Sequence, residues 1–478
     1  MRCREGNRSR HELKDTWRCL LSHSAEQPYI GAEGLERLHS YRYEGDDPSP
    51  LYKHALSPLA DLLVLHCCPS WAAPNLISFI GFLLVVSSHL LALYYSPTLS
   101  EPMPYWVHLY AGVMMFVNQT FDNMDGKQAR RTNSSSALGL AFDHGCDAVH
   151  SAIGGMTAMA SLQLGPPLQP LLAACCWLGG AAPFLFASWE HYHTGCLYLP
   201  VVNGPTEGML LLSIVHLIAG AVPDSEEFWT TEVPLLPGVD YREFGFFWHT
   251  VGVVLTCGRS IWRVATHIHG RKAKRKPVLN GTLHAPRTRL EQHDQNGHPD
   301  GMMLRKRTAV SAASAEYNGV TGARRQWGPP ECSLTDALLH LVPWLCVHVF
   351  AVWWIGSGRP PGHPSLWHTC PRMCFYFMSL MHCKLVMHLQ LCHVTGELMR
   401  PWRWTCCLSL GVLVLARLSC LAAPHMCTYE VPLLKAVCVA ALFSLTHLVL
   451  TVVPAIAAEL NIYVFSLQNR VGVNRVGV

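Results

Sequence analysis

The chain has 478 residues, of which half are hydrophobic and only 14% are charged. A typical soluble domain carries about 25% charged residues, so this composition indicates an integral membrane protein. The formal net charge of +4 is too small to suggest a nucleic-acid partner. Basic residues cluster beside apolar segments, as in proteins that contact a membrane surface. Most of the 20 Cys lie in or near apolar runs, where Cys behaves as a small hydrophobe, so we expect neither a disulfide framework nor a zinc site.

The first 70 residues are polar to amphipathic. Within them Leu35, Leu38 and Tyr41 recur at helical spacing, which predicts a short helix lying on the membrane. Residues 1–70 are therefore expected to form a cytosolic region with an interfacial amphipathic helix.

About ten apolar segments follow, each near the roughly 20 residues that span a bilayer. They lie at about 75–95, 104–124, 138–162, 168–188, 206–222, 245–267, 335–356, 368–392, 402–423 and 431–461. The weakest is 368–392, because His382, Lys384 and His388 lie within it. The predicted fold is all-α and polytopic, with about ten transmembrane helices and the N-terminal interfacial helix.

The longest polar break, 268–334, is basic at its start and then rich in Gly, Asn, His and Ser. It is typical of a disordered cytosolic loop. It separates a catalytic membrane core at 71–267 from C-terminal transmembrane helices at 335–462, and residues 463–478 are expected to be a cytosolic tail.

The distribution of Lys and Arg predicts the orientation, because positive residues favour the cytosolic side. With ten spans, the basic connections, among them Lys127–Arg131, 268–334 and 400–403, all fall on one side, while the 224–243 connection on the other side is acidic. Both termini and the 125–137 turn are therefore expected to face the cytosol.

Two pairs of carboxylates flank that turn. Asp122 and Asp125 end the second expected helix, and Asp143 and Asp147 lie near the start of the third. Spacings of three and four place side chains on one helix face, and a short turn brings the two pairs together. Isolated carboxylates of this kind are often only solvated turn residues or helix caps, but a set of four at a membrane boundary is costly and usually functional.

Divalent cations would offset the repulsion among these carboxylates. Oxygen ligands suit Mg²⁺ or Mn²⁺, and Mg²⁺ is commonly shared between carboxylates and substrate phosphates. Two ions about 4 Å apart form the usual clamp for displacement at phosphorus.

The residues between the carboxylates fit phosphate chemistry. Gly126 would let a phosphate or metal approach the backbone, and Ala129 and Gly139 would permit close helix packing. Arg130 can donate two hydrogen bonds to a phosphate. Lys127 is expected near phosphate, or as an anchor on the cytosolic side.

The chain carries the pattern Asp122-x2-Asp125-Gly126-x2-Ala129-Arg130-x8-Gly139-x3-Asp143-x3-Asp147. It resembles the signature of the CDP-alcohol phosphotransferases at every defined position. Further stretches resemble the eukaryotic choline and ethanolamine phosphotransferases in particular: 74–78, 125–136, 189–195 and 204–207. The resemblance covers about residues 33–460, without the 268–334 loop.

The resemblance implies a mechanism. Asp122, Asp125 and Asp143 would hold metals that grip the diphosphate of CDP-choline or CDP-ethanolamine, and Asp147 would be a metal ligand or general base. Asn75 would contact the nucleotide, or only cap its helix. A diacylglycerol hydroxyl would attack the phosphorus bearing the alcohol, releasing CMP and forming phosphatidylcholine or phosphatidylethanolamine. The resemblance also implies a membrane of the endoplasmic reticulum or Golgi and a tendency to form homodimers.

His144 is a second candidate base, since its unperturbed pKa of about 6.5 suits proton removal near neutrality. In eukaryotic relatives a Glu usually follows the motif glycine and can support this His, whereas this chain has Leu140 there. Because Leu140 cannot support His144, this difference favours Asp147 as the general base.

Four residues on the same side are head-group candidates: Trp189, Glu190, Tyr192 and Glu207. Aromatic rings with a carboxylate can hold an ammonium group, and an interfacial aromatic belt is the alternative interpretation.

Three other functions compete with this one. Another head group or acceptor, as in inositol or glycerophosphate transfer, would use the same motif. An ion-coupled transporter would also place Asp in spanning helices, although the Asp motif is not repeated as inverted-repeat transporters lead one to expect. A non-catalytic scaffold is the third, and the complete motif argues against it.

Overall fold

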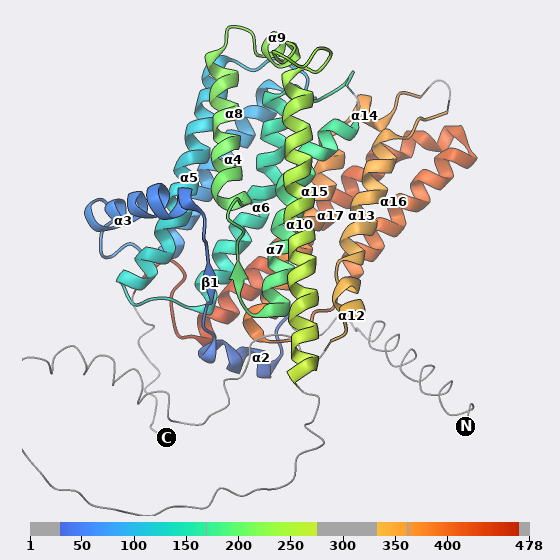
Figure 1. Cartoon of the computed structure of the whole chain (residues 1–478). Helices are drawn as coiled ribbons and strands as arrows, with labels where there is room; N and C mark the ends of the chain where they lie inside the picture. Colours follow the sequence, from blue (N-terminus) through green and yellow to red (C-terminus); the bar gives the residue numbers. More distant parts are fainter. Residues whose placement is uncertain (1–28, 169, 275–331, 361–362, 468–478) are drawn as a thin grey trace, which may run out of the picture. The chain divides into compact units, whose positions relative to one another are not determined.

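The computed structural model describes residues 29–168, 170–274, 332–360 and 363–467 (Figure 1). Contacts divide the chain into one unit of residues 1–268 with 328–478 and a second of residues 269–327. Only the end of one helix is described in the second unit, so the account below concerns the first. Most of the predicted 268–334 loop, residues 1–28 and most of the predicted tail lie outside the described residues.

The N-terminal region contains several short elements. They are α2 (Ala32–Arg37), η1 (Leu38–Ser40), β1 (Gly45–Asp46), η2 (Tyr52–Leu56) and α3 (Ser57–His66). The helix expected on the membrane is present, but it packs against protein. Leu38 is buried, and Arg37 Nη1 donates to the carbonyl of Gly396 at 2.9 Å. The exposed Leu62 and Leu65 of α3 instead offer apolar surface to a membrane, and α3 runs across the direction of α4 in Figure 1.

The next part of the chain is a helical bundle. Its elements are α4 (Pro74–Tyr95), α5 (Tyr105–Arg131), α6 (Ala137–Ser161), α7 (Pro170–Thr194), β2 (Leu197–Tyr198), η3 (Gly204–Gly208), α8 (Met209–Ala221), α9 (Ser225–Thr230) and α10 (Tyr241–Lys274). Helix α4 packs against both α5 and α6, α5 packs against α8, and α6 against α7. Strand β1 pairs in parallel with β2, Gly45 opposite Leu197. This pairing ties the N-terminal region to the bundle beside the start of α8.

The C-terminal part adds a second group of helices. They are α12 (Leu334–Leu339), α13 (Val342–Gly356), α14 (Leu366–Thr369), α15 (Pro371–Thr395), α16 (Trp404–Ala422), η4 (Pro424–Tyr429) and α17 (Glu430–Glu459). Helix α15 packs against α6, α7, α13 and α17. It therefore joins the C-terminal helices to the helix that carries Asp143 and Asp147.

The all-α membrane fold is confirmed. Six stretches of the described residues are long and apolar enough to cross a membrane: Pro74–Tyr95, Pro170–Thr194, Gly204–Ala221, Leu334–Gly356, Trp404–Ala422 and Pro424–Glu459. The other four expected spans are also helical, as α5, α6, α10 and α15. These four carry more polar or charged residues, and in α15 the neighbouring helices cover them: Arg372 Nε donates to the carbonyl of Ser96 at 3.0 Å. The count of ten spans stays a prediction.

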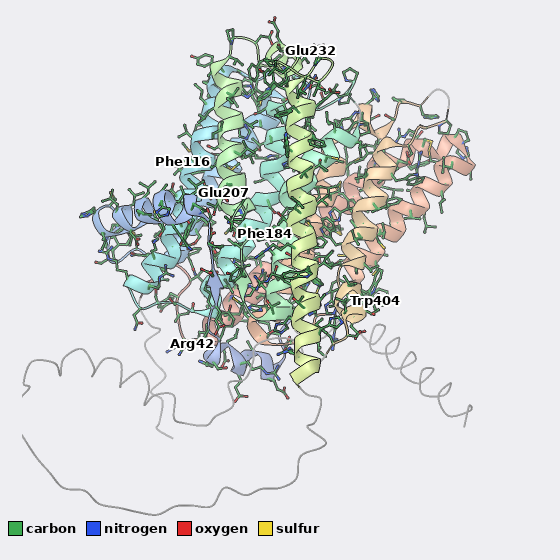
Figure 2. All side chains as sticks on the ribbon, viewed as in Figure 1. Arg42, Phe116, Phe184, Glu207, Glu232 and Trp404 are labelled. Atoms are coloured by element: carbon green, nitrogen blue, oxygen red, sulfur yellow. A yellow bond between two sulfur atoms is a disulfide. The ribbon has the colours of Figure 1, made fainter. Side chains whose placement is uncertain are left out.

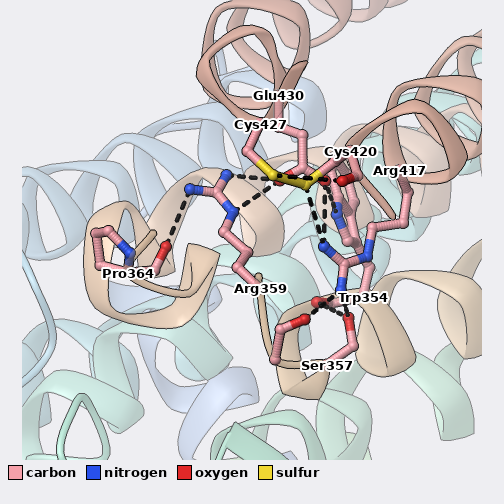
Figure 3. The surroundings of a disulfide bond; sticks show 9 residues. Trp354, Ser357, Arg359, Pro364, Arg417, Cys420, Cys427 and Glu430 are labelled. Carbon is pink, nitrogen blue, oxygen red and sulfur yellow. Dashed lines mark hydrogen bonds and ion pairs between the residues drawn. A yellow bond between two sulfur atoms is a disulfide. The ribbon is translucent and has the colours of Figure 1, made fainter. Parts of the chain in front are cut away.

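A disulfide joins Cys420 to Cys427 where α16 leads into α17 (Figure 3). The sequence did not suggest this pair, because both cysteines sit among apolar residues like most others in the chain. The other cysteines of the described residues are free, and this pair departs from the expectation that Cys serves here as a small hydrophobe.

Candidate active site

A short turn arranges the two acidic helix ends. Helix α5 ends at Arg131 and α6 begins at Ala137. Ser136 caps α6, its Oγ accepting from Gly139 N–H at 3.1 Å, as Ser commonly does at a helix start. Asn133 has a φ of 52°, a left-handed conformation that Asn adopts more easily than most residues. The chain therefore reverses direction within a few residues, and the ends of α5 and α6 lie side by side.

The structure brings the acidic side chains together. Carboxylate oxygens of Asp122, Asp125 and Asp143 all lie within 4.8 Å of one another. Asp143 and Asp147 form a second such group with a ring nitrogen of His144. Helix α4 contributes as well, because Ser78 Oγ donates to Asp125 Oδ2 at 2.6 Å. Three helices thus converge on one cluster of oxygen atoms.

This donor set fits a divalent cation. Carboxylate oxygens are the ligands of Mg²⁺ and Mn²⁺, and Asp143 belongs to both groups, as a ligand shared by two ions would. A third candidate group, Cys420, Cys427 and Glu430, does not fit a metal. Its sulfurs form the disulfide, and Glu430 is paired with arginines.

The candidate phosphate-binding residues lie along α5 with different partners. Lys127 Nζ pairs with Asp61 Oδ2 of α3 at 2.8 Å and donates to Ser57 Oγ at the same distance. Arg130 is exposed, and a Cβ added to Gly126 would lie 3.6 Å from its Nη1. Arg130 can therefore reach a phosphate from outside the cluster. Lys127 would first have to break its contacts with Asp61 and Ser57 of α3. Ala129 lies partly buried between them.

Asn75 and Gly139 meet at the start of α4. A Cβ on Gly139 would lie 3.8 Å from Asn75 Oδ1 and 3.7 Å from Ser136 Oγ, which are ordinary contact distances, so the described residues do not themselves require glycine here. Asn75 Nδ2 donates to the carbonyl of Val464 at 3.0 Å. The segment after α17 thus returns to the helix that carries the predicted nucleotide contact.

The surroundings of His144 come from distant parts of the chain. His144 is buried, and its Nδ1 has no hydrogen-bond partner among the described residues. Its ring lies 6.2 Å from that of Phe184, labelled in Figure 2, and 6.3 Å from that of His191. His191 in turn lies 3.8 Å from His393 of α15, measured between ring centroids. Sequence reasoning did not select His191, although it lies in the 189–195 stretch that resembles the family, and the packing of α7 on α6 brings it near His144.

Tyr43 is a second residue that the sequence did not select for this site. Its ring lies 6.0 Å from that of His191. Desolvation of its hydroxyl raises the pKa of Tyr43, and the nearby carboxylate of Asp143 raises it further. The loop between η1 and β1, which carries Tyr43, therefore borders the acidic cluster.

The structure does not bring the four head-group candidates together. Trp189 Nε1 donates to the carbonyl of Ala337 at 2.8 Å, and Glu190 pairs with Arg263 at 2.8 Å. Tyr192 OH donates to the carbonyl of Glu397 at 3.2 Å. Glu207, labelled in Figure 2, accepts from Asn203 N–H at 2.8 Å and from the hydroxyl of Ser49. Each binds a different element, so their head-group role stays a prediction that these contacts do not support.

Comparisons with known proteins find similarity in the part of the chain that contains the acidic cluster. Residues 71–221 match the CDP-alcohol phosphatidyltransferase family. Choline/ethanolaminephosphotransferase 1 of Arabidopsis thaliana is 44% identical over 217 residues, which are 45% of this chain and 54% of the relative. Choline/ethanolaminephosphotransferase 1 of Saccharomyces cerevisiae is 34% identical over 203 residues, 42% of this chain and 51% of the relative. Cholinephosphotransferase 1 of Xenopus laevis is 33% identical over 238 residues, which are 50% of this chain and 57% of the relative.

The chain spans about half the length of the curated relatives it matches. The matched part contains α4, α5, α6, α7 and α8. All four clustered aspartates lie within it. The similarity to the CDP-alcohol phosphatidyltransferase family thus falls on residues 71–221, the part of the chain that carries the acidic cluster.

Proposed function

We propose that the protein transfers phosphocholine, phosphoethanolamine or both from the CDP-alcohol to diacylglycerol. The products are phosphatidylcholine or phosphatidylethanolamine, and CMP. The observation that carries the proposal is the convergence of Asp122, Asp125, Asp143 and Asp147 within a family-matched domain. The names of the similar proteins support the choice of head group.

In the reaction, the free hydroxyl of diacylglycerol attacks the phosphorus that bears the alcohol. A new P–O bond forms, the bond from that phosphorus to the oxygen of CMP breaks, and the hydroxyl proton passes to a base on the protein. Asp122, Asp125 and Asp143 would hold two Mg²⁺ or Mn²⁺ ions. When bound, such ions neutralise the diphosphate charge and polarise its P–O bonds.

The remaining roles fall to side chains beside the cluster. Ser78 holds Asp125 in place, and Arg130 is exposed where it can donate to a phosphate oxygen. A carboxylate oxygen of Asp147 and a ring nitrogen of His144 both lie within 4.8 Å of a carboxylate oxygen of Asp143, which makes both side chains candidates for the base. Leu140 offers His144 no supporting carboxylate, which favours Asp147. Replacing each in turn distinguishes them, because loss of the true base lowers kcat and changes the pH dependence of the rate.

We place this chemistry at the cytosolic leaflet of the endoplasmic reticulum or Golgi membrane. A water-soluble CDP-alcohol would arrive from the cytosol and diacylglycerol through the bilayer. The basic connections beside the turn support this orientation. We also propose that residues 71–267 form the catalytic membrane core and residues 335–462 the C-terminal transmembrane helices. The protein is proposed to assemble as a homodimer.

The decisive experiment supplies purified full-length protein with diacylglycerol and labelled CDP-choline or CDP-ethanolamine, in separate reactions. We expect labelled phospholipid and CMP from at least one donor with Mg²⁺ or Mn²⁺, and neither product after chelation by EDTA. Restoring the metal should restore turnover. A parallel reaction with CDP-diacylglycerol and inositol tests the other head-group chemistry.

Failure of both donors to yield lipid in the presence of metal would contradict the proposal. Ion flux across sealed vesicles without CMP release would instead favour the transporter alternative.

A further inference from the structure

A narrow, partly open cavity beside the acidic cluster contains polar residues that the metal site does not use. Its lining includes Asp122, Asp143 and Asp147, together with Phe82, Asn118 and His150. The amide and the imidazole share this space with the carboxylates, but neither belongs to the groups that could hold a cation.

Asn118 and His150 form a second polar layer. Asn118 lies four residues before Asp122 on α5, and His150 lies three residues after Asp147 on α6. Each is thus about one helical turn, about 5.4 Å, from the carboxylates. Both lie nearer the middle of their helices than the carboxylates do and farther from the turn that joins α5 to α6. With that turn at the cytosolic leaflet, as proposed above, the second layer lies on the side of the cluster toward the bilayer centre.

The two side chains hold each other in position. Both are about nine-tenths buried, with 7% exposure each, and Asn118 Nδ2 lies 3.0 Å from His150 Nδ1. Because an amide nitrogen only donates, His150 Nδ1 accepts and its proton sits on Nε2, which lies 3.0 Å from Met115 Sδ. Asn118 keeps a second N–H and its carbonyl oxygen for another partner.

The space beside the side-chain oxygen of Asn118 depends on a glycine of the neighbouring helix α4. A Cβ added to Gly81 of α4 would lie 2.8 Å from Asn118 Oδ1, so glycine leaves space for this oxygen. Among the described residues no hydrogen-bond donor reaches it. A buried amide oxygen without a hydrogen bond is costly, so this oxygen is available to a ligand that can donate or to a bridging group.

The chemistry of the acceptor matches this arrangement. Diacylglycerol presents its hydroxyl, then ester groups, then acyl chains, and it comes from the membrane side. The carboxylate layer would receive the hydroxyl, and Asn118 would receive an ester oxygen one step deeper. Phe82, which also lines the cavity, would contact apolar carbons. A CDP-alcohol arriving from the cytosolic side would meet the carboxylates before it met Asn118.

We propose that Asn118, oriented by His150, binds an ester oxygen of the glycerol backbone of the acceptor lipid. This inference rests on the proposed transferase function and names the residue pair that selects a diacylglycerol as acceptor.

The test is steady-state kinetics of Asn118→Leu in the full-length protein, with each substrate varied in turn. Loss of one buried hydrogen bond corresponds to about a tenfold change. We expect the KM for diacylglycerol to rise about tenfold while the KM for the CDP-alcohol stays unchanged. His150→Asn should raise the same KM by less, because it disturbs only the orientation of Asn118.

A matched control removes another buried polar contact between the same two helices. His108 of α5 is buried and its Nδ1 lies 3.0 Å from Ser161 Oγ of α6, outside the cavity lining. We expect His108→Leu to change neither KM.

The lipid itself supplies a second measurement. A dialkylglycerol carries ether oxygens, which are poorer acceptors than ester carbonyls. Wild-type protein should show a raised KM for it, and Asn118→Leu should raise that KM no further.

Three outcomes would overturn the inference. With active wild-type protein, an unchanged KM for diacylglycerol in both Asn118→Leu and His150→Asn would remove the pair from acceptor binding. Equal rises in both KM values would mean a general disturbance of the site. A wild-type protein that transfers no head group at all would remove the proposed function, and the inference with it.

Discussion

Asp125 illustrates how a single carboxylate is held in place within this helical bundle. It is buried on α5, its Oδ2 accepts from Ser78, and Asp122 and Asp143 lie within 4.8 Å. Such a group has little freedom to turn away from a bound cation. Lys127, two residues on, differs, because α3 already holds its ammonium group. Side chains on one helix turn thus have distinct roles set by their partners from other elements.

Asp125→Asn is expected to abolish transferase activity. An amide keeps the size of the side chain but removes the negative charge that a divalent cation requires. The loss of several kcal/mol of transition-state stabilisation corresponds to a decrease in kcat of about 10³-fold or more. Asp46→Asn, at an exposed carboxylate of β1, is the control and should retain activity. Substantial turnover by Asp125→Asn would exclude its role as a metal ligand.

At the scale of elements, close backbone approach decides which helices can pack together. A Cβ on Gly180 of α7 would lie 2.8 Å from the carbonyl oxygen of Ser151 on α6. Because α6 carries Asp143 and Asp147, this contact sets how closely α7 and its His191 approach the acidic cluster. Gly139, which the sequence singled out for close packing, meets no such constraint.

Gly180→Ala should therefore destabilise the protein by about 1–3 kcal/mol, since α6 and α7 must separate to admit the methyl group. The measurement is thermal unfolding in detergent. Gly245→Ala on α10, where no heavy atom lies within 4 Å of an added Cβ, is the matched control. It should be neutral or slightly stabilising, because Ala favours helix over Gly. Equal unfolding temperatures for both variants would contradict the packing argument.

The junction of α16 and α17 is held by a buried charge cluster beside the disulfide (Figure 3). Glu430 is fully buried. It accepts from Trp354 Nε1 at 3.0 Å and Arg359 Nε at 2.7 Å, and pairs with Arg417 Nη1 at 3.5 Å. One carboxylate thus provides the counter-charge for two buried arginine side chains.

Glu430→Ala should cost about 3–5 kcal/mol of stability, because it leaves buried arginines without a counter-charge. The expected result is a clear fall in the unfolding temperature in detergent. Glu33→Ala removes the partner of Arg37 in an exposed pair and should change stability by less than about 1 kcal/mol. A Glu430→Ala protein as stable as the Glu33→Ala protein would show that the cluster does not stabilise the junction.

For the whole molecule, the charge pattern and the disulfide point to the same orientation. Disulfides persist in oxidising compartments, so the Cys420–Cys427 junction is expected to face the lumen. The end of α17 lies with the N-terminal region, where His39 contacts Glu459 at 3.0 Å, and that region is expected to face the cytosol. One helix then runs from the lumenal to the cytosolic side.

Glycosylation in microsomes tests this orientation. A sequon with flexible flanks, inserted after Leu235, which is 97% exposed in the loop between α9 and α10, should acquire a glycan that an endoglycosidase removes. The natural sequon at Asn133, in the catalytic turn, should stay unmodified and serves as the internal control. A glycan on Asn133 would contradict the proposed orientation and would show that the catalytic turn faces the lumen.

The sequence by itself determined the helical membrane fold and the pairing of carboxylates around one turn. Both follow from local rules: apolar runs of bilayer length form helices, and spacings of three and four place side chains on one face. The residues Asp122, Asp125, Asp143 and Asp147 are found in this way without any tertiary information.

Only the tertiary structure decided which distant residues join that turn. Ser78 comes from α4, Tyr43 from the N-terminal loop, and His393 from α15, and no periodicity links them to the motif. The same holds for the packing of α2 against protein and for the separate partners of Trp189 and Glu190. Such contacts depend on how helices cross, which the hydrophobic pattern of a chain apolar on most faces leaves undetermined.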